Sequence, residues 1–282
     1  MNTFDPMYYT NYWNQLNKAN ALLQRTYPLQ IFQESRSQPP LTFVLIHGSW
    51  ADGSFWDGIA DELRKRGSTV YTPTLAGHGK VNEKNVTHAQ ITKSVVDFIL
   101  QRNLHQIVLV GHSFGGSVIQ KVAEQIPDRI KRLVFWNAFV LRDGESLADQ
   151  FPPSTQEFLL GLAQQSDNNT ILLPFPFFRE TFANLADLPL ASKLYHEISP
   201  EPAGPLTEKL DLKRFYQLTI PKSYINLMED TATPPGEEYG WHPHLSSRLG
   251  VYRLIQGHGD HFSTARTEPR MIADLIIKAG RD

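Results

Sequence analysis

The chain has 282 residues, with 27 Lys and Arg against 29 Asp and Glu, so its formal charge is −2. This near balance argues against a nucleic-acid-binding protein, which would carry a clear basic excess. Hydrophobic residues make up 41% of the chain and charged residues 20%, which predicts a folded globular protein. The sequence contains no cysteine, which excludes disulfides, thiolate metal sites and cysteine nucleophiles.

The first 40 residues predict an amphipathic helix followed by a connector. Apolar residues recur at spacings of three and four between Tyr8 and Leu23, and a polar stretch then leads to Pro40. We expect this helix to dock on the body of the same chain; a lid, a dimer contact or a membrane-surface helix are the alternatives. The first twenty residues do not resemble a secretory signal, and no apolar run reaches about 18 residues, so we expect a cytoplasmic protein without a membrane span.

From Leu41 onward, short apolar runs alternate with helical patterns. The expected strands lie at 41–46, 69–71, 107–110, 133–136, 223–227 and 251–255, and the expected helices at 59–66, 88–101, 117–125 and 269–278. Several of the runs are almost entirely apolar, which is typical of strands covered on both faces of a parallel sheet. The alternation predicts an α/β fold with a doubly wound, mostly parallel sheet.

Residues 139–220 interrupt this alternation. The segment contains eight prolines and the aromatic group Phe175, Phe177 and Phe178. We expect a mostly helical cap, with residues 41–138 and 221–282 forming the core and residues 1–40 the N-terminal helix and connector. Ligands of open α/β sheets bind outside the carboxyl ends of the strands, so the cap would cover the site. The alternative is a set of connecting helices without a substrate role.

The segment from Ile107 to Gly116 carries the strongest chemical signal. An apolar strand leads into Gly111-His112-Ser113-Phe114-Gly115, which fits the pattern G-x-S-x-G, and a helical pattern follows. A serine on a sharp strand-to-helix turn is lifted clear of the sheet, and the helix N-terminus favours developing negative charge. We therefore predict that Ser113 is a nucleophile.

A serine nucleophile needs a histidine base and an acid that fixes the tautomer of that base. In this version of the chemistry the three residues follow the chain order Ser, acid, His. His261 lies after the last predicted strand and before the final helix, which makes it the expected base, with His258 as its nearest competitor. His242 and His244 are expected to be solvated loop residues.

The expected acid is Asp230, in the loop after the strand at 223–227. Its neighbour Glu229 is a real alternative. The loop one strand earlier offers only the amide of Asn137 until Asp143, and Asp260 beside the histidine is expected to be a supporting loop residue.

The oxyanion site should combine two backbone N–H groups, one of them from the residue after the nucleophile. That residue is Phe114, and the loop after the first predicted strand would present the N–H of Ser49 as the second donor. His47 precedes the nucleophile in the chain, so we interpret it as structural.

These segments resemble the α/β-hydrolase superfamily, and within it the compact esterase and hydroxynitrile-lyase group with plant methyl-ester esterases and bacterial pyrethroid-type carboxylesterases. The resemblance runs from about Leu41 to the C-terminus. It is carried by three segments: His47-Gly48-Ser49-Trp50 with Gly53 and Trp56, the turn Gly111–Gly116, and Gly257 with Asp260-His261 and Glu268-Pro269. The resemblance implies the α/β-hydrolase fold and also assigns the acid to Asp230.

Three positions separate the branches of that superfamily. The lyases of this group typically carry threonine where this chain has Gly48 and lysine where it has Phe262. Haloalkane dehalogenases need an aspartate at position 113, which is serine here. The stretch before Leu41 and the segment 139–220 depart from the group's pattern, so no substrate contact is transferred from it.

The sequence thus predicts a serine hydrolase that cleaves a carboxylic ester of a small, largely apolar molecule through an acyl-enzyme. Apolar substrate contacts are expected from four aromatic residues, Trp50, Phe139, Phe175 and Phe178. We expect no cofactor, no metal and no nucleic-acid partner, and a homodimer is a further option. The alternatives are lactone, amide or thioester cleavage or acyl transfer on the same triad, a non-catalytic small-molecule receptor, and a metal-dependent hydrolase built on the C-terminal histidines.

Overall fold

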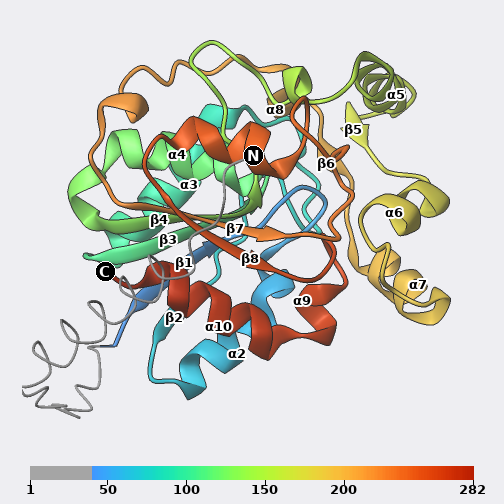
Figure 1. Ribbon diagram of the computed structural model, residues 1–282. Coiled ribbons are helices and arrows are strands. Elements are labelled where there is room, and N and C mark those ends of the chain that lie inside the picture. The colour runs from blue at the N-terminus through green and yellow to red at the C-terminus, as the bar shows by residue number, and fades with distance from the viewer. Residues whose placement is uncertain (1–39) are drawn as a thin grey trace, which may run out of the picture. The chain divides into compact units, whose positions relative to one another are not determined.

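The computed structural model describes residues 40–282, which form one unit, so the helix predicted near the N-terminus lies outside the described residues. A six-stranded parallel sheet runs through this unit in the order β2-β1-β3-β4-β7-β8 (Figure 1). Its strands are β1 (Thr42–Ile46), β2 (Thr69–Tyr71), β3 (Ile107–Ser113), β4 (Ile130–Ala138), β7 (Lys222–Leu227) and β8 (Arg253–Gly257). The predicted parallel α/β sheet is therefore confirmed.

Helices cover both faces of the sheet. Helices α3 (His88–Gln101) and α4 (Gly115–Gln125) pack together on one face, and α2 (Asp57–Lys65) and α10 (Pro269–Gly280) pack together on the other (Figure 1). Helix α3 begins with a capping box, in which Thr87 and Gln90 satisfy each other's backbone N–H groups. Short turns η1 (Gly53–Trp56), η2 (Pro127–Arg129), η5 (Trp241–Leu245) and η6 (Ser246–Leu249) and helix α9 (Thr264–Thr267) complete the core.

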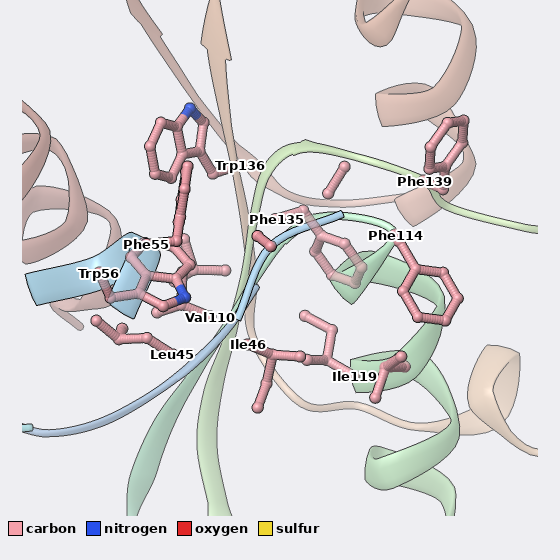
Figure 2. Close-up of a cluster of buried hydrophobic side chains, with 14 of the residues drawn as sticks. Leu45, Ile46, Phe55, Trp56, Val110, Phe114, Ile119, Phe135, Trp136 and Phe139 are labelled. Atoms are coloured by element: carbon pink, nitrogen blue, oxygen red, sulfur yellow. The ribbon is translucent and has the colours of Figure 1, made fainter. Parts of the chain in front are cut away.

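The apolar strands supply side chains to both layers of helices. Successive residues of a strand point to opposite faces, so an apolar pair such as Phe135-Trp136 fills the core on each side of the sheet. Figure 2 shows Trp136 beside Phe55 and Trp56 on one face, and Phe135 near Phe114 on the face covered by α4. This two-sided burial explains why these strands are continuous apolar runs rather than alternating ones.

The segment 139–220, which we call the cap segment, contains helices and two short strands that belong neither to the six-stranded sheet nor to the helices that cover it. Its elements are η3 (Ala148–Gln150), α5 (Pro153–Gln164), β5 (Thr170–Ile171), α6 (Phe175–Thr181), α7 (Leu188–Glu197), β6 (Glu201–Pro202), α8 (Gly204–Thr207) and η4 (Phe215–Gln217). Several prolines lie in the first turn of a helix, where the missing N–H is not needed. Figure 1 shows α5, α6 and α7 grouped together, apart from the helices that cover the sheet.

Strands β5 and β6 pair antiparallel, so the cap segment is not purely helical. Within residues 40–282, no helix is both long and apolar enough to cross a membrane.

Candidate active site

Ser113 is the last residue of β3 and has a left-handed backbone conformation, with φ 54°. Such a φ is uncommon for a residue with a side chain and costs free energy, so the surrounding structure must enforce it. The next helix, α4, begins two residues later at Gly115. A Cβ atom at Gly115 would lie 2.6 Å from the carbonyl oxygen of Ile46, so only glycine lets the turn pack this closely against β1.

Substitution by alanine is expected to have opposite effects on stability at Gly115, in this turn, and at Gly161, in α5. We expect Gly115→Ala to lower the free energy of unfolding by roughly 1–3 kcal/mol, because its methyl group would overlap backbone atoms. Gly161 lies inside α5 with open space where an added methyl group would lie, so Gly161→Ala should raise that free energy by about 0.5–1 kcal/mol. Urea denaturation of both variants checks this, and equal effects at the two positions would contradict the close packing at Gly115.

His261 and Asp230 lie against each other at the carboxyl edge of the sheet, after β8 and β7. The Nδ1 atom of His261 is 2.6 Å from Oδ2 of Asp230, and both side chains are buried. A carboxylate accepts hydrogen bonds, so this contact places the imidazole proton on Nδ1 and leaves Nε2 free to act as a base. The other carboxylate oxygen, Oδ1, accepts from the backbone N–H of Ala232 at 2.9 Å, which fixes the carboxylate plane.

Glu229 and His258, the alternatives to Asp230 and His261, do not take part in this contact, and neither does Asp260. The carboxylate of Glu229 accepts from the backbone N–H of Gly259, so it holds the loop that carries His261, the histidine loop, rather than the imidazole. Asp260 accepts from Leu185 N, Ser263 Oγ and Thr264 N, and thereby ties that loop to the cap segment. His258 is exposed to solvent.

Aromatic rings enclose the imidazole of His261. Trp241 stacks on it with a centroid distance of 5.3 Å and an interplanar angle of 8°, and Phe182 meets it edge-on at 5.4 Å. On another side it contacts the ring of His112, the residue directly before Ser113, at 4.5 Å between centroids. The strand end that carries Ser113 and the loop that carries His261 therefore lie side by side.

Sequence reasoning missed Trp241 and Phe182 as neighbours of the site. Trp241 belongs to the long connection between β7 and β8, and Phe182 to the turn after α6. Neither lies in a motif, and the pairing of each with His261 is a long-range contact that no local spacing encodes.

Asn137 uses its amide to join the ends of two neighbouring strands. Its Oδ1 accepts from the N–H of Leu227 at 2.7 Å, and its Nδ2 donates to the carbonyl of the same residue at 3.1 Å. The side chain thus replaces a missing backbone partner between β4 and β7. It supports the end of the strand from which the loop of Asp230 departs.

The loop after β1 approaches Ser113 closely. A Cβ atom at Gly48 would lie 2.6 Å from Cβ of Ser113, so the backbone of this loop reaches the serine only because residue 48 is glycine. Ser49 and Phe114, the two residues expected to provide oxyanion donors, both line the cavity that contains Ser113. Both residues thus lie at the same cavity as Ser113, and their role as oxyanion donors stays a prediction.

His47 is a buried, neutral residue that supports this loop. Its Nδ1 lies 2.8 Å from the carbonyl oxygen of Gly48, and its Nε2 accepts from the N–H of Leu75 at 3.1 Å. Burial and the neighbouring His78 lower the pKa of His47 to about 3. This tautomer and these partners agree with the structural role predicted for His47.

A cavity lies beside Ser113 between the core and the cap segment, and its empty space, counted together with its open mouth, is about 650 Å³. Its wall is largely aromatic and aliphatic, with Trp50, Phe114, Phe139, Phe151, Phe177, Phe182 and Trp241 among the lining residues. The polar members of the wall are Ser49, Ser113, Thr155 and Glu201. Such a site suits an apolar molecule that is oriented by a few polar groups.

Of the four expected aromatic contacts, Trp50 and Phe139 lie in the cavity wall, whereas Phe175 and Phe178 pack elsewhere within the described part of the chain. Residues three apart share one face of a helix, so Phe175 and Phe178 both turn toward Tyr195 of α7. Phe177 faces another direction and reaches the cavity instead.

The C-terminal histidines considered for a metal site are dispersed. In residues 40–282, no group of three His, Asp or Glu side chains is placed to hold a metal ion. His242 bonds to Ser246 at 2.7 Å, and His244 contacts Arg248 at 2.8 Å.

Comparison with known proteins finds relatives that are named as esterases and related hydrolases. It is 29% identical to a putative chloroplastic methylesterase 13 of Arabidopsis thaliana, over 68% of this chain and 46% of that protein. It is 26% identical to a pyrethroid hydrolase of Sphingobium wenxiniae, over 82% of this chain and 86% of that one. The chain spans about half the length of several of the curated relatives it matches.

A solved structure resembles the chain more strongly. It is an extracellular alpha/beta-hydrolase from a Paenibacillus species, described as sharing structural and functional homology with tobacco salicylic acid binding protein 2. The two chains are 62% identical with a TM-score of 0.85, over 86% of this chain and 100% of the other.

The family model for alpha/beta hydrolases matches residues 43–279. Sheet order, serine turn, histidine loop and sequence relatives thus agree on one assignment: the chain belongs to the alpha/beta hydrolase family.

Proposed function

We propose that the protein is a serine esterase that cleaves carboxylic esters of small, largely apolar molecules through an acyl-enzyme. The observation that carries this proposal is the contact between Nδ1 of His261 and Oδ2 of Asp230, because it leaves Nε2 as a base beside the strand end that carries Ser113. The relatives named as a methylesterase and a pyrethroid hydrolase support ester hydrolysis.

In the proposed acylation step, Oγ of Ser113 attacks the carbonyl carbon of the ester while Nε2 of His261 removes its proton. Asp230 stabilises the imidazolium that forms and keeps its orientation. The carbonyl oxygen becomes an oxyanion, which the N–H groups of Ser49 and Phe114 would bind. The tetrahedral intermediate then expels the alcohol, which receives the proton from His261.

In the proposed deacylation step, a water molecule attacks the acyl group on Ser113 and loses a proton to Nε2 of His261. The second tetrahedral intermediate releases the carboxylic acid and returns the proton to Oγ. The aromatic cage around His261, which includes Trp241 and Phe182, limits the access of bulk water to the imidazole.

The composition of the cavity favours an apolar substrate. We expect kcat/KM for p-nitrophenyl hexanoate to exceed that for the acetate by about 10-fold, since additional methylenes would leave water for an apolar wall. A series of p-nitrophenyl esters from acetate to octanoate measures this preference. A profile that is flat or falls from acetate onward would contradict the proposed apolar specificity.

The same assay distinguishes ester hydrolysis from the alternative reactions and from ligand binding without turnover. Matched lactone, p-nitroanilide and thioester substrates, assayed at equal concentration, should all be slower than the ester of the same acid. Faster turnover of any of these classes would replace the proposed ester with that class. Binding of the esters without any turnover would favour the small-molecule receptor.

The proposed partner is therefore a small-molecule ester, and the homodimer considered from the sequence stays a prediction. The cytoplasmic location also stays a prediction, and the Paenibacillus relative is described as extracellular.

A further inference from the structure

Trp50 is joined to the cap segment through every one of its hydrogen-bonding groups. Its backbone N–H donates to Oε2 of Glu201 at 2.7 Å, and its carbonyl accepts from the N–H of Ser199 at 2.9 Å. Its indole Nε1 donates to the carbonyl of Ile171 at 2.8 Å. Trp50 directly follows Ser49 and has φ 62°, a left-handed conformation that these bonds help to maintain.

Glu201 is itself held by a buried histidine. Its Oε1 lies 3.1 Å from Nε2 of His78, and both side chains are almost completely buried. Nδ1 of His78 lies 2.9 Å from the carbonyl oxygen of Ala76. A carbonyl and an ionised carboxylate only accept hydrogen bonds, so with Glu201 ionised both ring nitrogens carry protons and His78 is an imidazolium.

The electrostatics of the pair agree with this assignment. Burial alone would lower the pKa of His78, but the Glu201 carboxylate outweighs that effect and raises it above its ordinary value. Burial would likewise raise the pKa of Glu201, but the charge and hydrogen bond of His78 lower it. The ring of His78 also stacks on that of Phe114, with 5.8 Å between centroids, so it contacts the residue that follows the nucleophile.

We infer that Glu201 and His78 are positioning residues for the loop after β1, which carries Ser49: together they hold the Trp50 backbone so that the N–H of Ser49 faces the reacting carbonyl. This inference rests on the proposed esterase function. Glu201, a residue of the cap segment, would then help to orient the backbone N–H of Ser49 in the core. The N–H of Ser49 would stabilise the oxyanion, which develops only after the ester has bound. Loss of the pair should therefore lower kcat and leave KM nearly unchanged.

The test compares Glu201→Ala with Glu201→Gln in steady-state hydrolysis of one p-nitrophenyl ester. Glutamine keeps an oxygen that accepts from the N–H of Trp50, and its amide can donate to Nε2 of a neutral His78. We expect Glu201→Ala to lower kcat by at least about 10-fold and Glu201→Gln to restore most of it. Tyr195→Phe is the matched control, since it removes a cap hydrogen bond, from Tyr195 Oη to the carbonyl of Leu173, that does not involve Trp50.

A wild-type kcat in Glu201→Ala would overturn the inference, and so would a rise in KM alone, which would make Glu201 a substrate contact. An equal fall in kcat for Tyr195→Phe would also overturn it, because any loosening of the cap would then suffice. If Glu201→Ala does not fold, His78→Asn provides the test, since His78 does not line the cavity; its kcat should fall, and an unchanged kcat counts against the inference. Failure of the esterase proposal itself would look different, because the wild type would then show no turnover that depends on Ser113.

Discussion

Ser113→Ala is expected to lower kcat for ester hydrolysis by roughly 10⁵-fold or more, because it removes the atom that forms the acyl-enzyme. The substitution deletes one oxygen at the end of β3 and leaves the parallel ladder to β4 in place. We therefore expect the circular dichroism spectrum and the melting temperature of the variant to stay close to those of the wild type. Progress curves with p-nitrophenyl butyrate at high enzyme concentration measure the residual rate.

Ser223→Ala is the matched control for that variant. Ser223 is also a buried serine of the central sheet, but it lies near the start of β7, at the opposite edge, where its Oγ donates to the carbonyl of Ala279 at 2.9 Å. Its loss should affect stability more than turnover. Retention of turnover in Ser113→Ala, or an equal loss in Ser223→Ala, would contradict a nucleophilic role for Ser113.

Asp230→Asn should lower kcat by about 10⁴-fold, the cost known from another serine triad when the acid becomes an amide. The amide could donate to Nδ1 of His261 and so favour the tautomer in which Nε2 carries the proton and cannot act as a base. Stability should change far less than kcat, since the two side chains are nearly the same size. Initial rates across a range of pH, together with thermal melts, separate the two effects.

Glu229→Gln tests which of the two adjacent acids, Glu229 or Asp230, orients His261. The glutamine still offers an oxygen to the N–H of Gly259, so we expect kcat within about 3-fold of the wild type. A loss in Glu229→Gln as large as that in Asp230→Asn would contradict the assignment drawn from the 2.6 Å contact.

The fold was largely predictable because its strands and helices have strong, separate patterns. The expected helix at 88–101 and strand at 69–71 have the bounds found in the structure. The third and fourth strands are longer than expected, since β3 continues to Ser113 and β4 to Ala138. Glycine and polar residues interrupt an apolar sequence pattern, so the strands were expected to end before them. Here the backbone pairing of β3 and β4 continues through these residues into the site, because burial and the neighbouring strands outweigh their low strand propensity.

The positions of the candidate site residues were predictable where chain order and turn chemistry decide them, and less so where packing decides them. Ser113 ends a parallel strand, and Asp230 and His261 each follow one, so the topology brings all three to one edge of the sheet. Nothing local to Glu201 indicates that it pairs with His78 across 123 positions. The face of α6 that meets the cavity likewise depends on where α7 packs, which is why Phe177 rather than Phe178 lines the wall.

The most direct test of the proposed acyl-enzyme is the intact mass of the protein during turnover of a slowly deacylating aryl ester, with a fluorophosphonate as a second probe. We expect one covalent adduct per chain with each reagent, of the acyl or phosphonyl mass, located by peptide mapping on Ser113 and missing from Ser113→Ala. Ester turnover without any adduct, or an adduct that persists in Ser113→Ala, would contradict an acyl-enzyme on this serine.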